Sequence, residues 1–373
     1  MAIRLLASAL LLLLAPAPVS AQAPDALHQR ILSELREFTD WLERHDVQGY
    51  IGEVGWPDDE RAEADEWNAL AEAWLDDADA AGLWVTYWAT GEWWGHDYLL
   101  SAYEDPDSSG GVERANTQAP ILERHLGPGR GIVDAGGEFG YAPTTERTSK
   151  FSNRNPGKYD RAYHYDTAAT FEFLASRGIE LVKIPFRWER LQPRLGGRLD
   201  RDELRRLRGV TARAGAAGLD VVLDMHNFGA YYAARGGQGV RCAIGQRRCS
   251  VRDFADAWER IAKAFKTTEA VAAYTLMTEP VAMKPVGNRS APEVWRRASQ
   301  AAVTAIRRVG ERDATLFVSG YHWSGAYDWS RWNPEPWITD PSDATRYEAH
   351  HYWDQDHSGR YGDTYAEELA KAS

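Results

Sequence analysis

The sequence predicts an α/β protein folded as a closed (β/α)8 TIM barrel, and three observations support this fold class. Short runs rich in β-branched and aromatic residues alternate with helical patterns along most of the chain. Eight such runs within about 350 residues match the strand number and length of this barrel. No internal repeat or long Gly/Ser linker divides the chain. We therefore expect one domain over residues 22–373, with an open doubly wound sheet as the alternative.

The predicted strands are short apolar runs that end near polar residues. In chain order they cover residues 49–55, 83–89, 131–137, 179–186, 219–226, 273–280, 315–320 and 346–353. The first run, GYIGEVG, places Glu53 between glycines in an otherwise apolar stretch. This composition is typical of a buried strand that ends at a site.

Helical patterns fill the intervals between these strands. They cover residues 26–46, 60–81, 114–125, 166–178, 200–217, 251–267 and 291–310, with a fragment at 363–372. Strands joined by helices of this length form a parallel sheet, which is the basis of the barrel prediction.

The first 21 residues have the pattern of a secretory signal. Arg4 precedes an apolar run from Leu5 to Ala15, and small residues at 19–21 predict cleavage after Ala21. The apolar run is shorter than the roughly 20 residues of a membrane span, and no later segment approaches that length. We expect a secreted or periplasmic protein with no membrane-spanning segment.

The chain has two cysteines, Cys242 and Cys249, in a Gly/Arg-rich loop. In an oxidising compartment they indicate one loop-closing disulfide, with two free thiols as the alternative. A zinc site lacks further ligands nearby. Residues 354–359 begin like a calcium loop, but Tyr365 stands where a bidentate glutamate is required. We expect no metal and no cofactor.

The charge balance limits the partners that the protein is expected to bind. The formal net charge is −12, with 26% charged and 44% hydrophobic residues, as in ordinary globular proteins. An acidic balance without a block of lysine and arginine argues against nucleic acid and anionic membranes. A neutral partner fits better, and we expect a monomer.

The carboxyl ends of the predicted strands carry residues suited to acid/base chemistry. Active sites of (β/α)8 barrels lie at this end, where the sequence places Glu53, Trp88, Arg187, His226, Glu279, His350 and Tyr352. Each of these residues alone has a structural alternative, such as a surface glutamate, a strand-bridging arginine or a core histidine. Together they predict one acid/base site.

Four motifs resemble glycoside hydrolase family 5, in its endo-β-1,4-glucanase branch. They are VKIPFRWERLQP (182–193), VVLDMHNFGAYY (221–232), YTLMTEP (274–280) and YEAHHYWDQDHSG (347–359). The resemblance implies hydrolysis of β-glucan with retention of configuration. It also implies that Glu279 is the acid/base and that a second glutamate, at the end of the family's seventh strand, is the nucleophile.

The order of the segments differs from that of the family. Residues 49–57 resemble the family's strand seven and residues 83–95 its strand eight, yet both precede residues 130–373, which resemble the beginning of a family member. We therefore expect a circular permutation, in which residues 26–125 correspond to the usual C-terminal part and 130–373 to the usual N-terminal part. Glu53 is then the nucleophile, on a strand between those of His350 and Trp88.

The resemblance also implies roles for the surrounding residues. Arg187 and Tyr352 would keep Glu53 ionised, while His226 and His350 would contact sugar hydroxyls and orient the carboxylates. Trp88 would stack on a sugar ring. Further tryptophans in predicted loops are candidates for a sugar-binding cleft, namely Trp93, Trp94, Trp188, Trp323, Trp329, Trp332, Trp337 and Trp353.

Thr278 departs from the family pattern, which has asparagine before the acid/base. That asparagine hydrogen-bonds the 2-hydroxyl of the sugar, so threonine predicts reduced activity or a different sugar. The main hypothesis is a secreted endo-β-1,4-glucanase. Mannan, xyloglucan and mixed-linkage glucan remain open as substrates, and a non-catalytic glucan-binding barrel is the second hypothesis.

Overall fold

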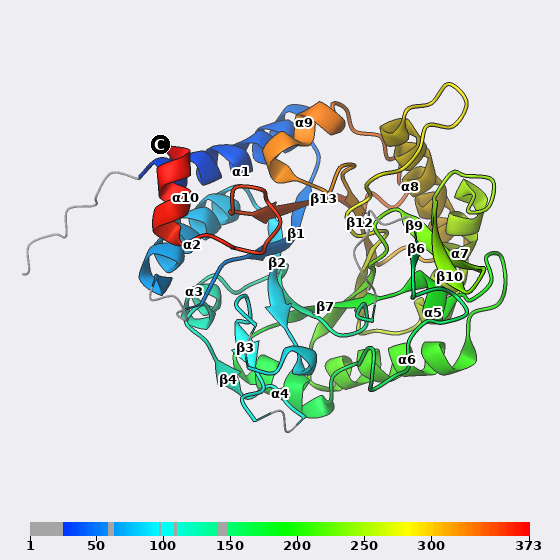
Figure 1. Cartoon of the computed structure of the whole chain (residues 1–373), viewed down its shortest axis with the longest axis horizontal. Helices are drawn as coiled ribbons and strands as arrows, with labels where there is room; N and C mark the ends of the chain where they lie inside the picture. Colours follow the sequence, from blue (N-terminus) through cyan, green and yellow to red (C-terminus); the bar gives the residue numbers. More distant parts are fainter. Residues whose placement is uncertain (1–24, 59–62, 97, 108–109, 141–147) are drawn as a thin grey trace, which may run out of the picture.

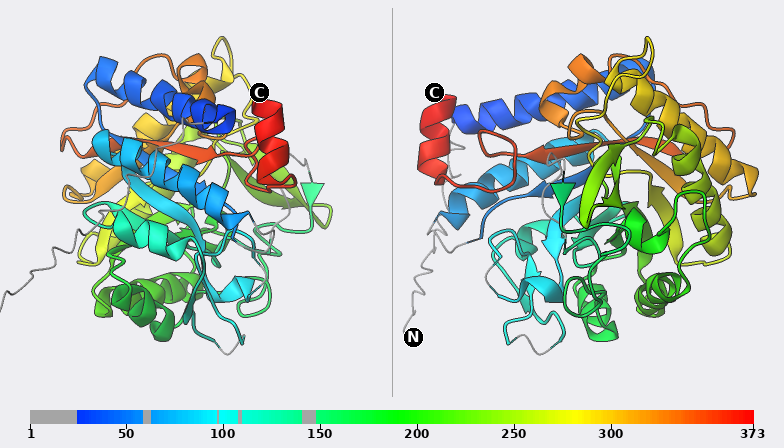
Figure 2. Two further views of the ribbon diagram at one scale, coloured as in Figure 1. Left: turned by 90° about the vertical axis from the view of Figure 1, so that its left-hand side faces the viewer. Right: turned by 45° about the vertical axis from the view of Figure 1, so that its right-hand side comes forward.

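The computed structural model of the protein describes residues 25–58, 63–96, 98–107, 110–140 and 148–373. The predicted signal, residues 1–21, lies outside the described residues. Eight parallel strands form a closed barrel surrounded by helices (Figures 1 and 2). In order around the barrel they are β1 (Gly49–Gly55), β2 (Trp84–Thr90), β5 (Arg130–Asp134), β7 (Leu181–Phe186), β8 (Asp220–Met225), β11 (Val271–Thr275), β12 (Thr315–Ser319) and β13 (Thr345–Tyr352).

The barrel closes at β1, which pairs in parallel with both β13 and β2. This confirms the predicted barrel and the predicted place of the Glu53 strand, between those of His350 and Trp88. The open doubly wound sheet is thereby excluded. Two short strands, β3 (Tyr103–Glu104) and β4 (Arg114–Ala115), extend the sheet beyond β2.

The helices form the outer layer of the barrel (Figure 2). They are α1 (Ala26–His45), α2 (Ala64–Ala80), α3 (Ala119–Arg124), α4 (Ala168–Ser176), α5 (Trp188–Leu191), α6 (Arg201–Ala216), α7 (Val251–Phe265), α8 (Ala291–Arg308), α9 (Trp329–Trp332) and α10 (Tyr365–Ala372). Helix α7 shows why they form where they do. Ser250 and Asp253 make a capping box at its start, and apolar residues three or four apart, such as Phe254 and Trp258, are buried against the barrel.

The first and last described helices lie side by side, as Figure 1 shows for α1 and α10. The hydroxyl of Tyr365 donates to Asp25 Oδ2 over 2.7 Å, so the start of α1 is tied to the start of α10. Among the residues with described positions, no helix is long and apolar enough to cross a lipid bilayer.

The interior of the barrel has an apolar layer below a polar one. Tyr50 and Phe317 stack at a centroid distance of 3.9 Å in a cluster with Leu181, Val222 and Ala273. The next layer toward the carboxyl ends of the strands holds buried polar side chains, namely Thr86, Lys183, Asp224 and Glu348. This polar layer lies directly beneath the residues that the sequence assigned to the site.

Two regions differ from the predicted elements. The helix expected over 114–125 begins only at Ala119, with Pro120 in its first turn, and residues 114–115 form β4 instead. The Gly/Arg-rich loop is a β-hairpin of β9 (Ala230–Arg235) and β10 (Gln238–Ala243), joined by two glycines with positive φ. Strand β6 (Thr148–Ser149) extends this hairpin to three strands.

The two cysteines lie at the base of this hairpin as free thiols, so the predicted disulfide is not formed in the structure. They are close enough for a thiol hydrogen bond, which lowers the pKa of Cys242. The disulfide therefore remains a prediction for the oxidised protein.

Candidate active site

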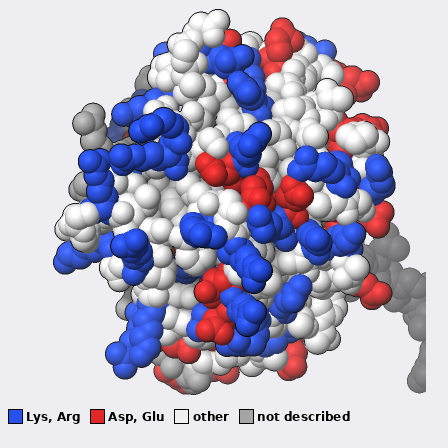
Figure 3. Space-filling view, turned by 90° about the vertical axis from the view of Figure 1, so that its right-hand side faces the viewer, with Lys and Arg blue, Asp and Glu red and all other residues white. Residues whose placement is uncertain are grey.

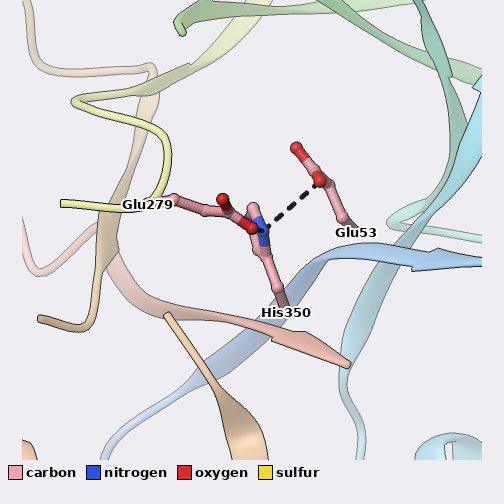
Figure 4. A group of neighbouring side chains, drawn as sticks. All are labelled: Glu53, Glu279 and His350. Atoms are coloured by element: carbon pink, nitrogen blue, oxygen red, sulfur yellow. Dashed lines mark hydrogen bonds and ion pairs between the residues drawn. The ribbon is translucent and has the colours of Figure 1, made fainter. Parts of the chain in front are cut away.

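Glu53 and Glu279 face each other across the carboxyl end of the barrel (Figure 4). Glu53 lies on β1, and Glu279 follows β11 in a loop. One oxygen of each carboxylate lies within 4.8 Å of the other and of a nitrogen of His350. Glu279 has a left-handed backbone with φ of 47°, which is uncommon for a non-glycine residue.

His350 joins the two carboxylates. Its Nδ1 lies 2.9 Å from Glu279 Oε1 and 3.4 Å from Glu53 Oε2, while its Nε2 lies 3.3 Å from Glu348 Oε1. Burial opposes the charged form of the imidazole, but the three carboxylates outweigh it and raise the pKa of His350 to about 10. His350 is therefore a cation at neutral pH and donates to its carboxylate neighbours.

A buried ion pair supports His350 from below. Lys183 Nζ lies 2.7 Å from Glu348 Oε1, and both side chains are fully buried. Lys183 also donates to the carbonyl oxygen of Gly52, one residue before Glu53. Burial alone would raise the pKa of Glu348, but Lys183 and His350 lower it, so Glu348 stays ionised. The Lys183–Glu348 pair thus contacts both His350 and the backbone next to Glu53.

Gly52 makes room for this arrangement. A Cβ at residue 52 would lie 2.0 Å from Glu348 Oε1. The glycine before Glu53 therefore has a packing reason, since any side chain there would displace the buried carboxylate.

The surroundings of Glu53 have opposing effects on its pKa. Burial is the main influence and raises its pKa, the nearby Glu279 raises it further, and His350 lowers it. Tyr352 donates its hydroxyl to Glu53 Oε2 over 2.8 Å. Tyr352 and Arg187 are the two groups predicted to keep Glu53 ionised. Tyr352 makes the expected contact, whereas the nearby positive charge is that of His350.

Arg187 lies in the same cavity but is directed to other partners. It donates to the carbonyl oxygen of His226, and its Nε lies 3.6 Å from Glu189 Oε2. The side chain is fully buried. These contacts hold the loop after β8 against α5, so Arg187 supports the site through His226.

His226 and Thr278 share one buried carboxylate, that of Asp224. His226 Nδ1 lies 2.9 Å from Asp224 Oδ2, and Thr278 Oγ1 donates to Asp224 Oδ1 over 2.6 Å. The hydroxyl of Thr278 is thus turned into the protein, and the residue is fully buried. Because Asp224 accepts this hydroxyl, Thr278 positions that carboxylate. The reduced activity or different sugar expected from threonine at this position stays a prediction.

A cavity of 560 Å³ opens above these residues. Of the predicted site residues, Trp88, Arg187, His226, Glu279, His350 and Tyr352 line it. Trp88 is partly exposed and its indole nitrogen donates to the hydroxyl of Tyr98. Glu53 and Thr278 lie just behind the lining, with Glu53 only 4% exposed.

Several residues of the site were not predicted from the sequence. Glu138, Phe228, Tyr327 and His357 also line the cavity. Glu138 follows Gly136 and Gly137 at the end of a predicted strand, and this position is the signal that could have identified it. Of the loop tryptophans, Trp323 lines the cavity, whereas Trp188, Trp329 and Trp353 are fully buried in the core.

Comparison with known proteins identifies a family. The family model for Cellulase (glycosyl hydrolase family 5) matches residues 142–372. A curated relative, "Probable endo-beta-1,4-glucanase B" of Neosartorya fischeri, is 29% identical over 61% of this chain and 61% of its own length. The chain therefore matches less than two thirds of this relative.

Two bacterial enzymes of known structure are similar. Endoglucanase Cel5A of Pseudomonas stutzeri is 34% identical with a TM-score of 0.52, over 62% of this chain and 63% of its own. The endo-beta-1,4-glucanase Xac0029 of Xanthomonas axonopodis pv. citri is 31% identical with a TM-score of 0.52, over 65% of this chain and 72% of its own. Because the family model covers more than half of the chain, the protein belongs to the cellulase family, glycosyl hydrolase family 5.

Proposed function

We propose that the protein is a retaining endo-β-1,4-glucanase that cleaves a β-glucan by double displacement. The observation that carries this proposal is the pair of carboxylates from β1 and the β11 loop, whose closest oxygens lie within 4.8 Å. Retaining glycosidases hold their two carboxyl groups about 5 to 5.5 Å apart, whereas inverting enzymes leave about 6.5 to 9.5 Å for a water molecule. The short separation therefore favours retention.

Glu53 and Glu279 have different roles in the two steps of this reaction. Glu53, held by Tyr352 and near cationic His350, attacks the anomeric carbon and forms a glycosyl-enzyme intermediate. Glu279 protonates the leaving oxygen and then takes a proton from the attacking water. His350 is 2.9 Å from Glu279, so it fixes the direction of that carboxyl group. Trp88 offers an aromatic face for a sugar ring at the cavity wall.

We also propose that the chain is a circular permutation of the family's usual order. In support, the family match begins at residue 142, whereas β1 and β2, which carry Glu53 and Trp88, complete the barrel between β13 and β5. A reordered gene in which residues 22–128 follow residue 373 through a short linker tests this proposal. It should give a folded, equally active barrel, and an inactive product from an active parent would contradict the permutation.

The protein is proposed to be exported, as a monomer, after cleavage at Ala21. N-terminal sequencing of the protein recovered from the periplasm or medium, together with light scattering, tests both points. A product that keeps residues 1–21, or a stable dimer, would contradict them.

The substrate is tested by measuring reducing-sugar release from cellulose derivatives, mixed-linkage glucan, xyloglucan and mannan. Proton NMR of the first product should show the β-anomer. The second candidate, a glucan-binding barrel without turnover, is motivated by Thr278 at the position next to the acid/base. Retention in a glucan gel without release of reducing ends would favour that candidate.

A further inference from the structure

Two neighbouring segments of this acidic protein contain only basic charged residues. Between Asp224 and Asp253 the chain has five arginines and no carboxylate. Between Glu279 and Glu293 it has Lys284 and Arg289, again without a carboxylate. The net charge of −12 for the whole chain therefore conceals a local excess of positive charge.

These segments form a groove of 690 Å³ beside the β9–β10 hairpin. Five cationic side chains line it, and we call it the basic groove: Arg235, Arg241, Arg247, Arg248 and Lys284. Among the residues whose positions the structure describes, no aspartate or glutamate is part of the lining. The hairpin lies on the right-hand side of Figure 1, and Figure 3 shows that side of the molecule with many of its lysine and arginine side chains at the surface.

The charges in the groove are available to a ligand. Arg235, Arg247, Arg248 and Lys284 are exposed, and none of them forms an ion pair with a carboxylate within the described parts of the chain. The acidic residue that follows the hairpin, Asp253, accepts from the backbone and hydroxyl of Ser250 in the cap of α7. Arginine side chains that are not already paired can bind carboxylates through two parallel hydrogen bonds.

Arg241 lies in the wall between the basic groove and the catalytic cavity. Its guanidinium donates to the carbonyl oxygens of Phe228, Val281 and Ala282. Phe228 lines the cavity, and Ala282, three residues after Glu279, lines the groove. A sugar chain that leaves the cavity past Phe228 would therefore meet the groove.

We propose that the basic groove binds carboxylate-bearing substituents of an acidic polysaccharide whose β-linked backbone occupies the catalytic cavity. This inference rests on the proposed glucanase function and adds the substrate's charge to it. The groove has the volume of a site for one or a few sugar units. The groove lies beside the catalytic cavity, so a substrate bound in the cavity would bring its substituents to the groove. This position favours a glycan substituent over an anionic membrane or nucleic acid.

The test compares two soluble glucans that differ in charge, carboxymethyl-cellulose and the neutral hydroxyethyl-cellulose. The double variant Arg247→Gln/Arg248→Gln removes two groove cations. The matched control, Arg205→Gln/Arg312→Gln, removes two exposed arginines outside the groove and changes the net charge equally. KM is measured at low salt and at about 1 M NaCl, where the screening length falls to about 3 Å.

We expect the groove variant to raise KM for carboxymethyl-cellulose by roughly three- to tenfold at low salt, which corresponds to weak exposed ion pairs. KM for hydroxyethyl-cellulose and kcat on both should not change, and the effect should vanish at high salt. Equal shifts in the groove variant and in the control, or equal shifts on both glucans, would overturn the proposal.

A binding assay separates this inference from the proposed function. Retardation in gels containing each glucan needs no turnover and can be measured with Glu279→Gln. Groove-dependent retardation by the acidic glucan, in a protein that hydrolyses nothing, would support the groove and refute the glucanase. Groove-dependent binding to anionic vesicles or DNA without retardation by the acidic glucan would overturn the proposal.

Discussion

The protein should become less stable as the pH rises from about 6.5 to about 10, because His350 loses its stabilising charge over this range. A histidine whose folded pKa exceeds its unfolded value stabilises the fold fully below the unfolded pKa, and this contribution is lost as the pH rises through the folded pKa. The ordinary value is near 6.5, and the three neighbouring carboxylates raise the pKa of His350 to about 10. The residue is only 3% exposed. The loss should therefore approach about 5 kcal/mol at 1.36 kcal/mol per pKa unit.

Urea denaturation at several pH values between 6 and 10 measures this loss. The wild-type protein is compared with His350→Gln and with the exposed control His96→Gln. The His350 variant should be less stable at pH 6, and its free energy of unfolding should fall less steeply toward pH 10. Titration of the His350 ring by NMR gives a second readout if the variant does not fold. Parallel pH curves for the wild type and His350→Gln, or a ring that titrates near 6.5, would show that the neighbouring carboxylates do not hold His350 in its charged form.

Two further substitutions test the layer beneath the site. Gly52→Ala should cost about 1–3 kcal/mol of stability by overpacking, because its Cβ would lie 2.0 Å from Glu348 Oε1. Thermal unfolding measures this loss, with Gly362→Ala as the control because the space around its Cβ is open. Equal melting temperatures for the two variants would contradict the overpacking at residue 52. Thr278→Val should cost about 1–3 kcal/mol, because it removes the donor to Asp224 Oδ1. Thr278→Ser should recover most of that loss, and a serine variant as unstable as the valine one would show that the hydroxyl is not the cause.

The strand ends could be predicted because local sequence determines them. Apolar runs alternating with helical patterns place Glu53, His226 and His350 at the carboxyl ends of strands, and strand parity places His350 and Tyr352 on one face. The structure brings these residues around one cavity. The same parity turns His351 outward, where it accepts from the indole nitrogen of Trp74.

The polar layer inside the barrel could not be predicted in this way. Lys183 interrupts an apolar strand, and its partner Glu348 lies 165 residues away in the sequence. Only the closed barrel brings them together. The hydrogen bond of Thr278 could not be predicted for a similar reason, since nothing in its local sequence shows that Asp224 will accept its hydroxyl. The basic groove was missed because net charge averages over segments that fold onto different faces.

The roles of Glu53 and Glu279 are tested most directly by measuring hydrolysis when either carboxylate is made neutral. Glu53→Gln and Glu279→Gln are assayed for reducing-sugar release on the preferred glucan, with Glu335→Gln, whose side chain is 74% exposed, as the control. Circular dichroism checks that each variant is folded. We expect no detectable turnover for Glu53→Gln, a loss of at least about 10²-fold for Glu279→Gln, and unchanged turnover for the control. Folded variants of either residue that keep turnover within tenfold of the wild type would contradict the assignment of the active site.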